Sequence, residues 1–132
     1  MQEGDGSVCL VGVGKMLAVV ESAAEALVAD GIECTVWDPR VVQPLDPALV
    51  ADCARHRLVV TVEDGLRDGG AGTGVAEAVA EVAFGPSAPA VRVLGLPTQF
   101  LPHGKPDDLL AAQGLDADGV AAEVRRCLDL LA

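Results

Sequence analysis

The order of apolar and polar positions divides the chain into short strands separated by helices. Uninterrupted apolar stretches at 8–13 and 58–62 predict strands that are buried on both faces of a sheet, and the run 91–94 predicts a further strand. Residues 32–37 alternate between apolar and polar side chains. This period of two predicts a strand near the edge of the sheet, with one face less buried than the other.

Helices are predicted between and after these strands. In two of them apolar residues recur at spacings of three and four, and Asp46 followed by Pro47 is a typical helix start. The predicted helices cover 16–30, 47–53, 71–83, 107–114 and 115–132. Because parallel neighbours need crossover helices, the alternating order predicts a three-layer α/β/α domain with a mostly parallel, doubly wound sheet of about four strands.

Length and composition agree with a single domain of this class. The chain has 132 residues, the size of one ordinary domain. Residues 1–7 are polar and rich in glycine, so we expect a linker remnant there and a folded domain over 8–132. Aromatic residues make up only 2% of the chain, so the core has to be built from aliphatic side chains.

Charge and cysteine usage exclude several partners. A net charge of −11 makes a nucleic acid or an anionic membrane an unfavourable partner, because each phosphate contact would oppose the field of the protein. The four cysteines never form C-x-x-C, which favours buried free thiols in a reducing compartment over a zinc or redox site. With no signal peptide and no membrane-length apolar run in the sequence, we expect a cytoplasmic protein without a metal site.

A cluster of glycines at 69–74 follows the strand at 58–62 and opens a helix. Its spacing matches neither a dinucleotide fingerprint nor a Walker loop. Two interpretations remain: the glycines let the helix pack closely against the sheet, or the helix N-terminus and Thr73 bind an anion. The carboxylates of Glu63, Asp64 and Asp68 would repel an anion there, so close packing is favoured.

Candidate catalytic residues are few. Glu63 and Asp64 are adjacent on a strand and therefore point to opposite sides, which makes them a poor general acid and base pair. We expect one to accept hydrogen bonds from loop amides and the other to be solvated. His103 is expected either to stabilise its loop or to contact a partner or substrate. The residues alone thus indicate a domain without a self-sufficient active site.

Three stretches, taken in order, resemble a known family. They are VWDPRVVQPLD (36–46), LVVTVEDGLRDGGAGTGVAEAV (58–79) and VLGLPTQFLPHG (93–104), and they are similar to the C-terminal domain of the 1-deoxy-D-xylulose-5-phosphate synthases, members of the transketolase family. The residues that carry the resemblance are Asp38, Arg40, Pro44, Leu45 and Asp46; then Glu63, Asp64, Gly69, Gly70, Gly72, Thr73, Gly74 and Val75; then Gly95, Leu96, Pro97, Phe100, Leu101, Pro102, His103 and Gly104.

The resemblance implies an accessory role. Enzymes of that family have three α/β domains, with thiamine diphosphate and magnesium held between the first two, and join pyruvate to glyceraldehyde 3-phosphate with loss of carbon dioxide for isoprenoid synthesis. No catalytic, cofactor-binding or metal-binding residue carries over to this chain, which alone is expected to be inactive. Its implied partners are the upstream catalytic domains and a second copy in a homodimer. The candidate interface residues are Glu63, Asp64, Arg67, Gly69, Gly70, Gly72, Thr73 and His103.

One departure from the family and two alternatives stay open. The family's domain begins with an additional antiparallel edge strand, for which the polar start MQEGDGS leaves no room, so we expect 32–37 to have an unpaired edge. The chain is alternatively a free-standing interaction module that docks on a separate catalytic chain. The third possibility is a small phosphate- or nucleotide-binding α/β protein that uses the glycine cluster.

Overall fold

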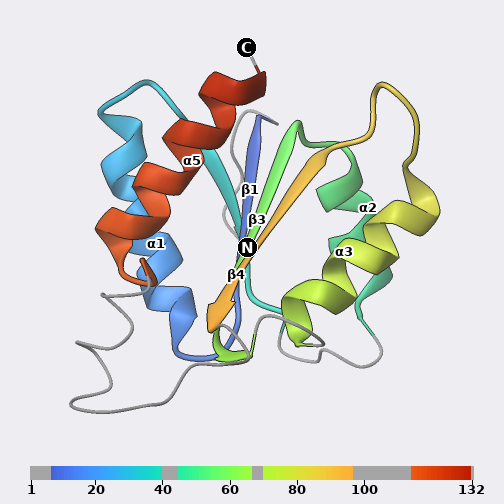
Figure 1. The fold of residues 1–132 in the computed structure, drawn as a ribbon, viewed down its shortest axis with the longest axis horizontal. Coiled ribbons are helices and arrows are strands. Elements are labelled where there is room, and N and C mark those ends of the chain that lie inside the picture. The colour runs from blue at the N-terminus through green and yellow to red at the C-terminus, as the bar shows by residue number, and fades with distance from the viewer. Residues whose placement is uncertain (1–6, 40–44, 67–69, 97–113, 132) are drawn as a thin grey trace.

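The sheet has four parallel strands in the order β2-β1-β3-β4 (Figure 1). The computed structural model describes residues 7–39, 45–66, 70–96 and 114–131. The elements are β1 (Val8–Gly12), α1 (Met16–Val28), β2 (Cys34–Trp37), α2 (Pro47–Ala54), β3 (Leu58–Leu66), α3 (Ala71–Val82), β4 (Ala90–Leu96) and α5 (Ala117–Leu131). The predicted α/β class with a parallel, doubly wound sheet is confirmed.

Two layers of helices cover the sheet, one on each face. Helices α1 and α5 lie on one face and α2 and α3 on the other, as Figure 1 shows. The chain moves from β1 to β2 in one direction, then crosses back over β1 to β3 and on to β4. Because such crossovers are right-handed, the reversal of direction places α2 and α3 on the face opposite α1.

The core consists of two aliphatic clusters separated by the sheet. Val8 and Leu10 of β1 belong to the cluster under α1 and α5, whereas Cys9 and Val11 belong to the cluster under α2 and α3. Side chains of successive strand residues alternate between faces, so a strand covered on both sides has to be apolar throughout. This explains the unbroken apolar run of β1, and all four cysteines are buried and free, as predicted.

The edge position of β2 is confirmed, and so is its less buried face, since Glu33 is exposed whereas Cys34 and Val36 on the other face are buried. Strand β2 pairs only with β1 among the described residues, at the end of the sheet. Thr35 is nevertheless buried, because the imidazole of His56, just after α2, lies over it and Nε2 is 3.0 Å from its hydroxyl. A polar residue in an alternating pattern can thus be buried when a polar partner covers it.

Strands β3 and β4 extend beyond their predicted ends. An irregularity between Val62 and Leu66 shifts the register, and the two strands pair again at Leu66 and Leu96. Residues 95 and 96, predicted to start a loop, therefore belong to β4. The start of α2 follows the prediction, since Asp46 accepts a hydrogen bond from the Ala48 amide at 2.9 Å and Pro47 is the first helical residue.

Some predicted segments lie outside the described residues. These are positions 1–6 of the expected linker and the expected helix at 107–114 apart from Gly114, which lies in a turn. Within the described residues, none of the helices combines the length and the apolar composition needed to cross a membrane.

Glu123 links α5 to the edge strand β4. Its carboxylate accepts from Arg92 of β4 at 2.9 Å and from Arg126 at 2.5 Å. The hydrogen bond and charge of Arg126 outweigh burial and hold the pKa of Glu123 below its ordinary 4.5. A lowered folded-state pKa contributes stability above the unfolded value, and that stability is lost as the pH falls through the folded value.

We therefore expect the free energy of unfolding of Glu123→Gln to fall less steeply at acid pH than that of the wild type. At neutral pH the variant should be less stable by about 0.5 kcal/mol, because the arginines are largely exposed. Below pH 4.5 the difference should shrink, because the unfolded chain then takes up a proton at Glu123 and the folded chain follows at a lower pH. Urea unfolding at several pH values measures this, with Asp129→Asn on the same helix as control. A difference that stays constant down to acid pH would contradict the assignment.

Candidate functional site at the carboxyl ends of the strands

The order in which the chain adds strands to the sheet reverses between β1 and β3: β2 is added on one side of β1, and β3 and β4 on the other. Open α/β sheets bind ligands outside the carboxyl ends of the strands at such a point. Here Lys15, which follows β1, and Asp64 of β3 form an ion pair at 3.7 Å, with side chains that are 53% and 47% exposed. Exposed ion pairs contribute little to stability. These two side chains are therefore accessible to a partner.

Glu63 lies next to Asp64 but is only 6% exposed. Its two carboxylate oxygens accept hydrogen bonds from the amides of Ala71 and Gly72, each at 3.1 Å. These amides belong to the first turn of α3, whose N-cap residue Gly70 has no side chain with which to cap them. The prediction that one carboxylate accepts amide hydrogen bonds while its neighbour is exposed is thus confirmed.

The carboxylate of Glu63 occupies the place that an anion would take. A helix N-terminus attracts negative charge because its free amides and its dipole point outward. In this chain the attraction is satisfied from within, and a phosphate at the Ala71 and Gly72 amides would have to displace a buried carboxylate. The geometry therefore favours a structural contact over a phosphate-binding site. We call this contact between Glu63 of β3 and the start of α3, residues 70–72, the joint.

Gly72 lies where α3 presses against the sheet. A Cβ at Gly72 would collide with the hydroxyl of Thr61 on β3 and would lie 2.7 Å from Cγ1 of Val93 on β4. A Cβ at Gly74 would meet nothing within 4 Å. The packing interpretation of the glycine cluster is therefore confirmed at Gly72 and wrong at Gly74, which faces open space.

Thr61 is fully buried, and its hydroxyl has no hydrogen-bond partner among the described residues. A buried hydroxyl without a partner loses its hydration without compensation. We expect the isosteric Thr61→Val to raise the free energy of unfolding by about 1 kcal/mol. Urea denaturation measures this, with Thr73→Val, at a half-buried residue of α3, as the matched control. A destabilised Thr61→Val would show that the hydroxyl is satisfied in solution.

The remaining candidate residues divide into two groups. Gly70 and Thr73 lie at the start of α3, beside Gly72. Arg67, Gly69 and His103 lie outside the described residues. The structure thus brings Glu63, Gly70 and Gly72 together in one joint and leaves Asp64 as the exposed carboxylate next to it.

Comparison with known families decides the kind of domain. The family model described as the C-terminal domain of transketolase matches residues 1–120. The chain belongs to this family. It is 48% identical over 123 residues to 1-deoxy-D-xylulose-5-phosphate synthase 1 of Streptomyces coelicolor, and 43% identical over 123 residues to the synthase of Anaeromyxobacter sp. (strain K).

This transketolase C-terminal domain corresponds to only part of each relative. The two alignments cover 93% and 92% of the chain but only 18% and 19% of the relatives. A solved structure titled "Split gene transketolase, inactive beta4 tetramer" superposes with a TM-score of 0.84 and 35% identity, over 98% of this chain and 41% of that one. The fold expected from the resemblance is therefore confirmed.

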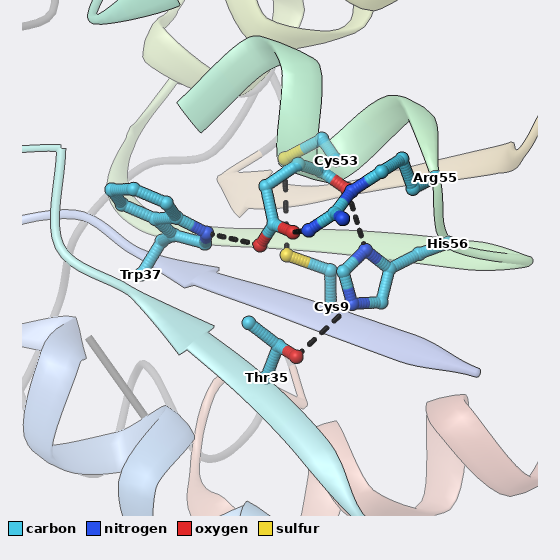
Figure 2. Close-up of polar contacts among 7 residues, drawn as sticks. Cys9, Thr35, Trp37, Cys53, Arg55 and His56 are labelled. Carbon is cyan, nitrogen blue, oxygen red and sulfur yellow. Dashed lines mark hydrogen bonds and ion pairs between the residues drawn. The ribbon is translucent and has the colours of Figure 1, made fainter. Parts of the chain in front are cut away.

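Sequence reasoning missed a polar cluster between α2 and the strands, drawn in Figure 2. The Asp52 carboxylate accepts from Nε1 of Trp37 at 2.7 Å and also pairs with Arg55. Nδ1 of His56 lies 2.7 Å from the backbone oxygen of Asp52, and Nε2 contacts Thr35. Burial raises the pKa of Asp52, but the hydrogen bonds from Trp37 and Arg55 outweigh burial and leave the pKa below its ordinary 3.8.

A weak sequence signal for this cluster did exist. Asp52 and His56 are four residues apart at the end of a helix and so share one face. Their partners Thr35 and Trp37 are separated from them by 21 and 15 residues. Only the register of β2 beneath α2 brings the two pairs together.

Proposed function

We propose that this chain is the C-terminal domain of a thiamine-diphosphate-dependent 1-deoxy-D-xylulose-5-phosphate synthase, and that it assists catalysis without performing it. The observation that carries the proposal is the 48% identity to a named synthase over 93% of the chain. In the whole enzyme, a transferase, pyruvate and glyceraldehyde 3-phosphate would react in upstream domains that hold thiamine diphosphate and magnesium. This domain would support those domains and the homodimer.

The surroundings of the two carboxylates agree with a non-catalytic role. Both oxygens of Glu63 accept hydrogen bonds from amides of α3, and Asp64 forms an ion pair with Lys15. A general base has to reach a substrate proton, which the buried and doubly bonded Glu63 does not. Asp64 and Lys15 are accessible at the carboxyl edge of the sheet, so we assign them to the face that contacts the upstream domains.

The other interface candidates enter the proposal in different ways. Glu63, Gly70 and Gly72 would act indirectly, by fixing the start of α3, and Thr73 lies in that first turn. Arg67, Gly69 and His103 are assigned to the same face on the family resemblance alone. Four buried free thiols favour a reducing compartment such as the cytoplasm.

A second candidate is a separate subunit that docks on a catalytic chain without a covalent link. The solved structure with a TM-score of 0.84 is titled as the product of a split gene, so a transketolase whose parts are separate chains exists among the similar structures. In this version the same face would form an interface between subunits. The two candidates share the contacts and differ only in chain connectivity.

Both candidates are tested by adding the chain in trans to a synthase that lacks its own last domain. The Streptomyces coelicolor synthase 1 without the segment aligned to this chain supplies the first two domains. Carbon dioxide release from pyruvate and glyceraldehyde 3-phosphate, with thiamine diphosphate and magnesium, is the readout. We expect none from the chain alone and a concentration-dependent rise when the chain is added to the truncated enzyme.

The charge-reversed variant Asp64→Lys should weaken that rise, whereas Asp129→Lys on α5 serves as a control of the same charge change. Turnover by the chain alone would overturn the non-catalytic role. No rise at any concentration of a folded chain would count against docking. Heat released on titrating the chain with inorganic phosphate or a nucleotide would instead favour a phosphate-binding protein.

A further inference from the structure

The strongest unexplained cluster lies between β1 and α2, on the same face of the sheet as α3 but nearer the amino ends of the strands. Cys9, Asp52 and His56 each offer a ligand atom, and these three atoms all lie within 4.8 Å of one another. Cys9 comes from β1, Asp52 from the last turn of α2 and His56 from just beyond that helix. Figure 2 shows Cys9 and His56 beneath α2. Thiolate, imidazole and carboxylate are the three donor types that zinc uses in proteins.

A second thiol lies beside Cys9. The sulfur of Cys53, on α2, is 3.8 Å from the sulfur of Cys9, and both residues are fully buried. This is the separation of a hydrogen bond between two thiols, so Cys53 contacts the donor Cys9 but is not one of the three converging donors.

The groups around the donors orient them as they do around known metal sites. The backbone oxygen of Asp52 can only accept, so Nδ1 of His56 carries the proton and Nε2 carries the lone pair. A metal-binding histidine commonly donates its other N–H to a carbonyl in this way, and metal-binding carboxylates are themselves hydrogen-bonded. Trp37 and Arg55 provide those bonds to Asp52.

Charge balance also favours a divalent cation here. A Zn²⁺ ion together with the Cys9 thiolate, the Asp52 carboxylate and neutral His56 has no net charge, which limits the desolvation penalty of burial. The proton of the Cys9 thiol would leave to solvent, and the Thr35 hydroxyl would rotate away from Nε2. The Asp52 side chain is 13% exposed, so the site has an edge through which an ion can enter.

We propose that Cys9, Asp52 and His56 form a zinc site that fastens α2 to β1, with water as the fourth ligand. The site lies away from the carboxyl ends of the strands, so the ion would stabilise the domain and take no part in the reaction. Because the donors converge only in the folded chain, zinc would bind the native state and raise its stability.

Cobalt substitution tests this proposal on the chain as it stands. The chain is stripped with a chelator under reducing conditions and titrated with Co²⁺, whose tetrahedral thiolate complexes absorb in the visible and near ultraviolet. We expect one equivalent of Co²⁺ to produce thiolate-to-metal charge transfer and visible bands, and Zn²⁺ to abolish them. One equivalent of Zn²⁺ should also raise the melting temperature of the stripped chain.

Variants locate the site and separate ligation from folding. Cys9→Ala should remove the charge-transfer band, whereas Cys127→Ala, which removes a buried free thiol on α5, should leave the band unchanged. Asp52→Asn preserves the shape of the side chain and should weaken Co²⁺ binding at least tenfold. Trp37→Phe should weaken it about 10- to 100-fold, as loss of a group that orients a ligand does.

The proposal is overturned by any of three results. These are a stripped, folded chain that shows no charge-transfer band with excess Co²⁺, a band that survives in folded Cys9→Ala, and a band that is lost in Cys127→Ala. Circular dichroism of each variant establishes that it is folded. Should Cys9→Ala fail to fold, Asp52→Asn decides, since unchanged Co²⁺ affinity in that variant is equally incompatible with the site.

Discussion

Replacing Glu63 by alanine is expected to lower the free energy of unfolding by about 3 kcal/mol, because the change leaves the Ala71 and Gly72 amides without an acceptor and opens a cavity. Both oxygens of Glu63 are used, one by Ala71 and one by Gly72. The same substitution removes the negative charge that complements the start of α3. The N-cap residue Gly70 has no side chain with which to replace Glu63.

The neighbouring Asp64→Ala provides the matched control for Glu63→Ala. Asp64 is exposed and forms only a surface ion pair at 3.7 Å with Lys15, so its loss should change stability by about 0.5 kcal/mol or less. Urea unfolding followed by circular dichroism measures both variants. Equal losses for the two would show that burial of the Glu63 carboxylate does not hold the joint together.

Gly72→Ala is expected to destabilise the domain by about 2 kcal/mol, because overpacking against the sheet outweighs the gain in helix propensity. The new methyl group would collide with Thr61 and lie 2.7 Å from Val93, and both belong to strands that cannot easily move. Strain of this kind forces backbone shifts or side chains out of their rotamers. Equilibrium unfolding in urea gives the difference.

The same substitution two residues further along α3, at Gly74, should have the opposite effect on stability. Gly74→Ala places a methyl group in open space, so only the helix propensity changes and the domain should gain about 0.5–1 kcal/mol. Helix propensity alone would make both substitutions stabilising, so a loss of stability at Gly72 has to come from its packing against the sheet. If both substitutions stabilised the domain, α3 would not press against the sheet at Gly72.

Much of the fold could be predicted because periodicity reports burial directly. The unbroken apolar runs of β1 and the first half of β3 identified strands covered on both faces. The extension of β3 to Leu66 could not be foreseen, because Glu63, Asp64 and Gly65 are poor strand formers and only the renewed pairing of Leu66 with Leu96 holds them extended. That pairing depends on a partner 30 positions away along the chain.

The candidate site was predictable in kind and not in detail. Alternation along a strand was enough to expect different environments for Glu63 and Asp64, and it did not say which of the two would be buried. The sequence does not distinguish one glycine of the cluster from another. That Gly72 contacts the sheet while Gly74 faces open space could be seen only once the position of β4 beneath α3 was known. The cluster of Cys9, Asp52 and His56 was hidden because Cys9 lies on β1, far along the chain from the end of α2 where the other two lie.

The most direct test of the account is a domain exchange in which residues 8–132 replace the matching segment of the Streptomyces coelicolor synthase 1. A covalent link removes affinity between chains as a variable, and carbon dioxide release from pyruvate and glyceraldehyde 3-phosphate is measured. We expect the exchanged enzyme to turn over, and the same enzyme without any last domain to be impaired. A folded, thiamine-loaded exchange enzyme no more active than the truncated one would contradict the proposed role of this domain.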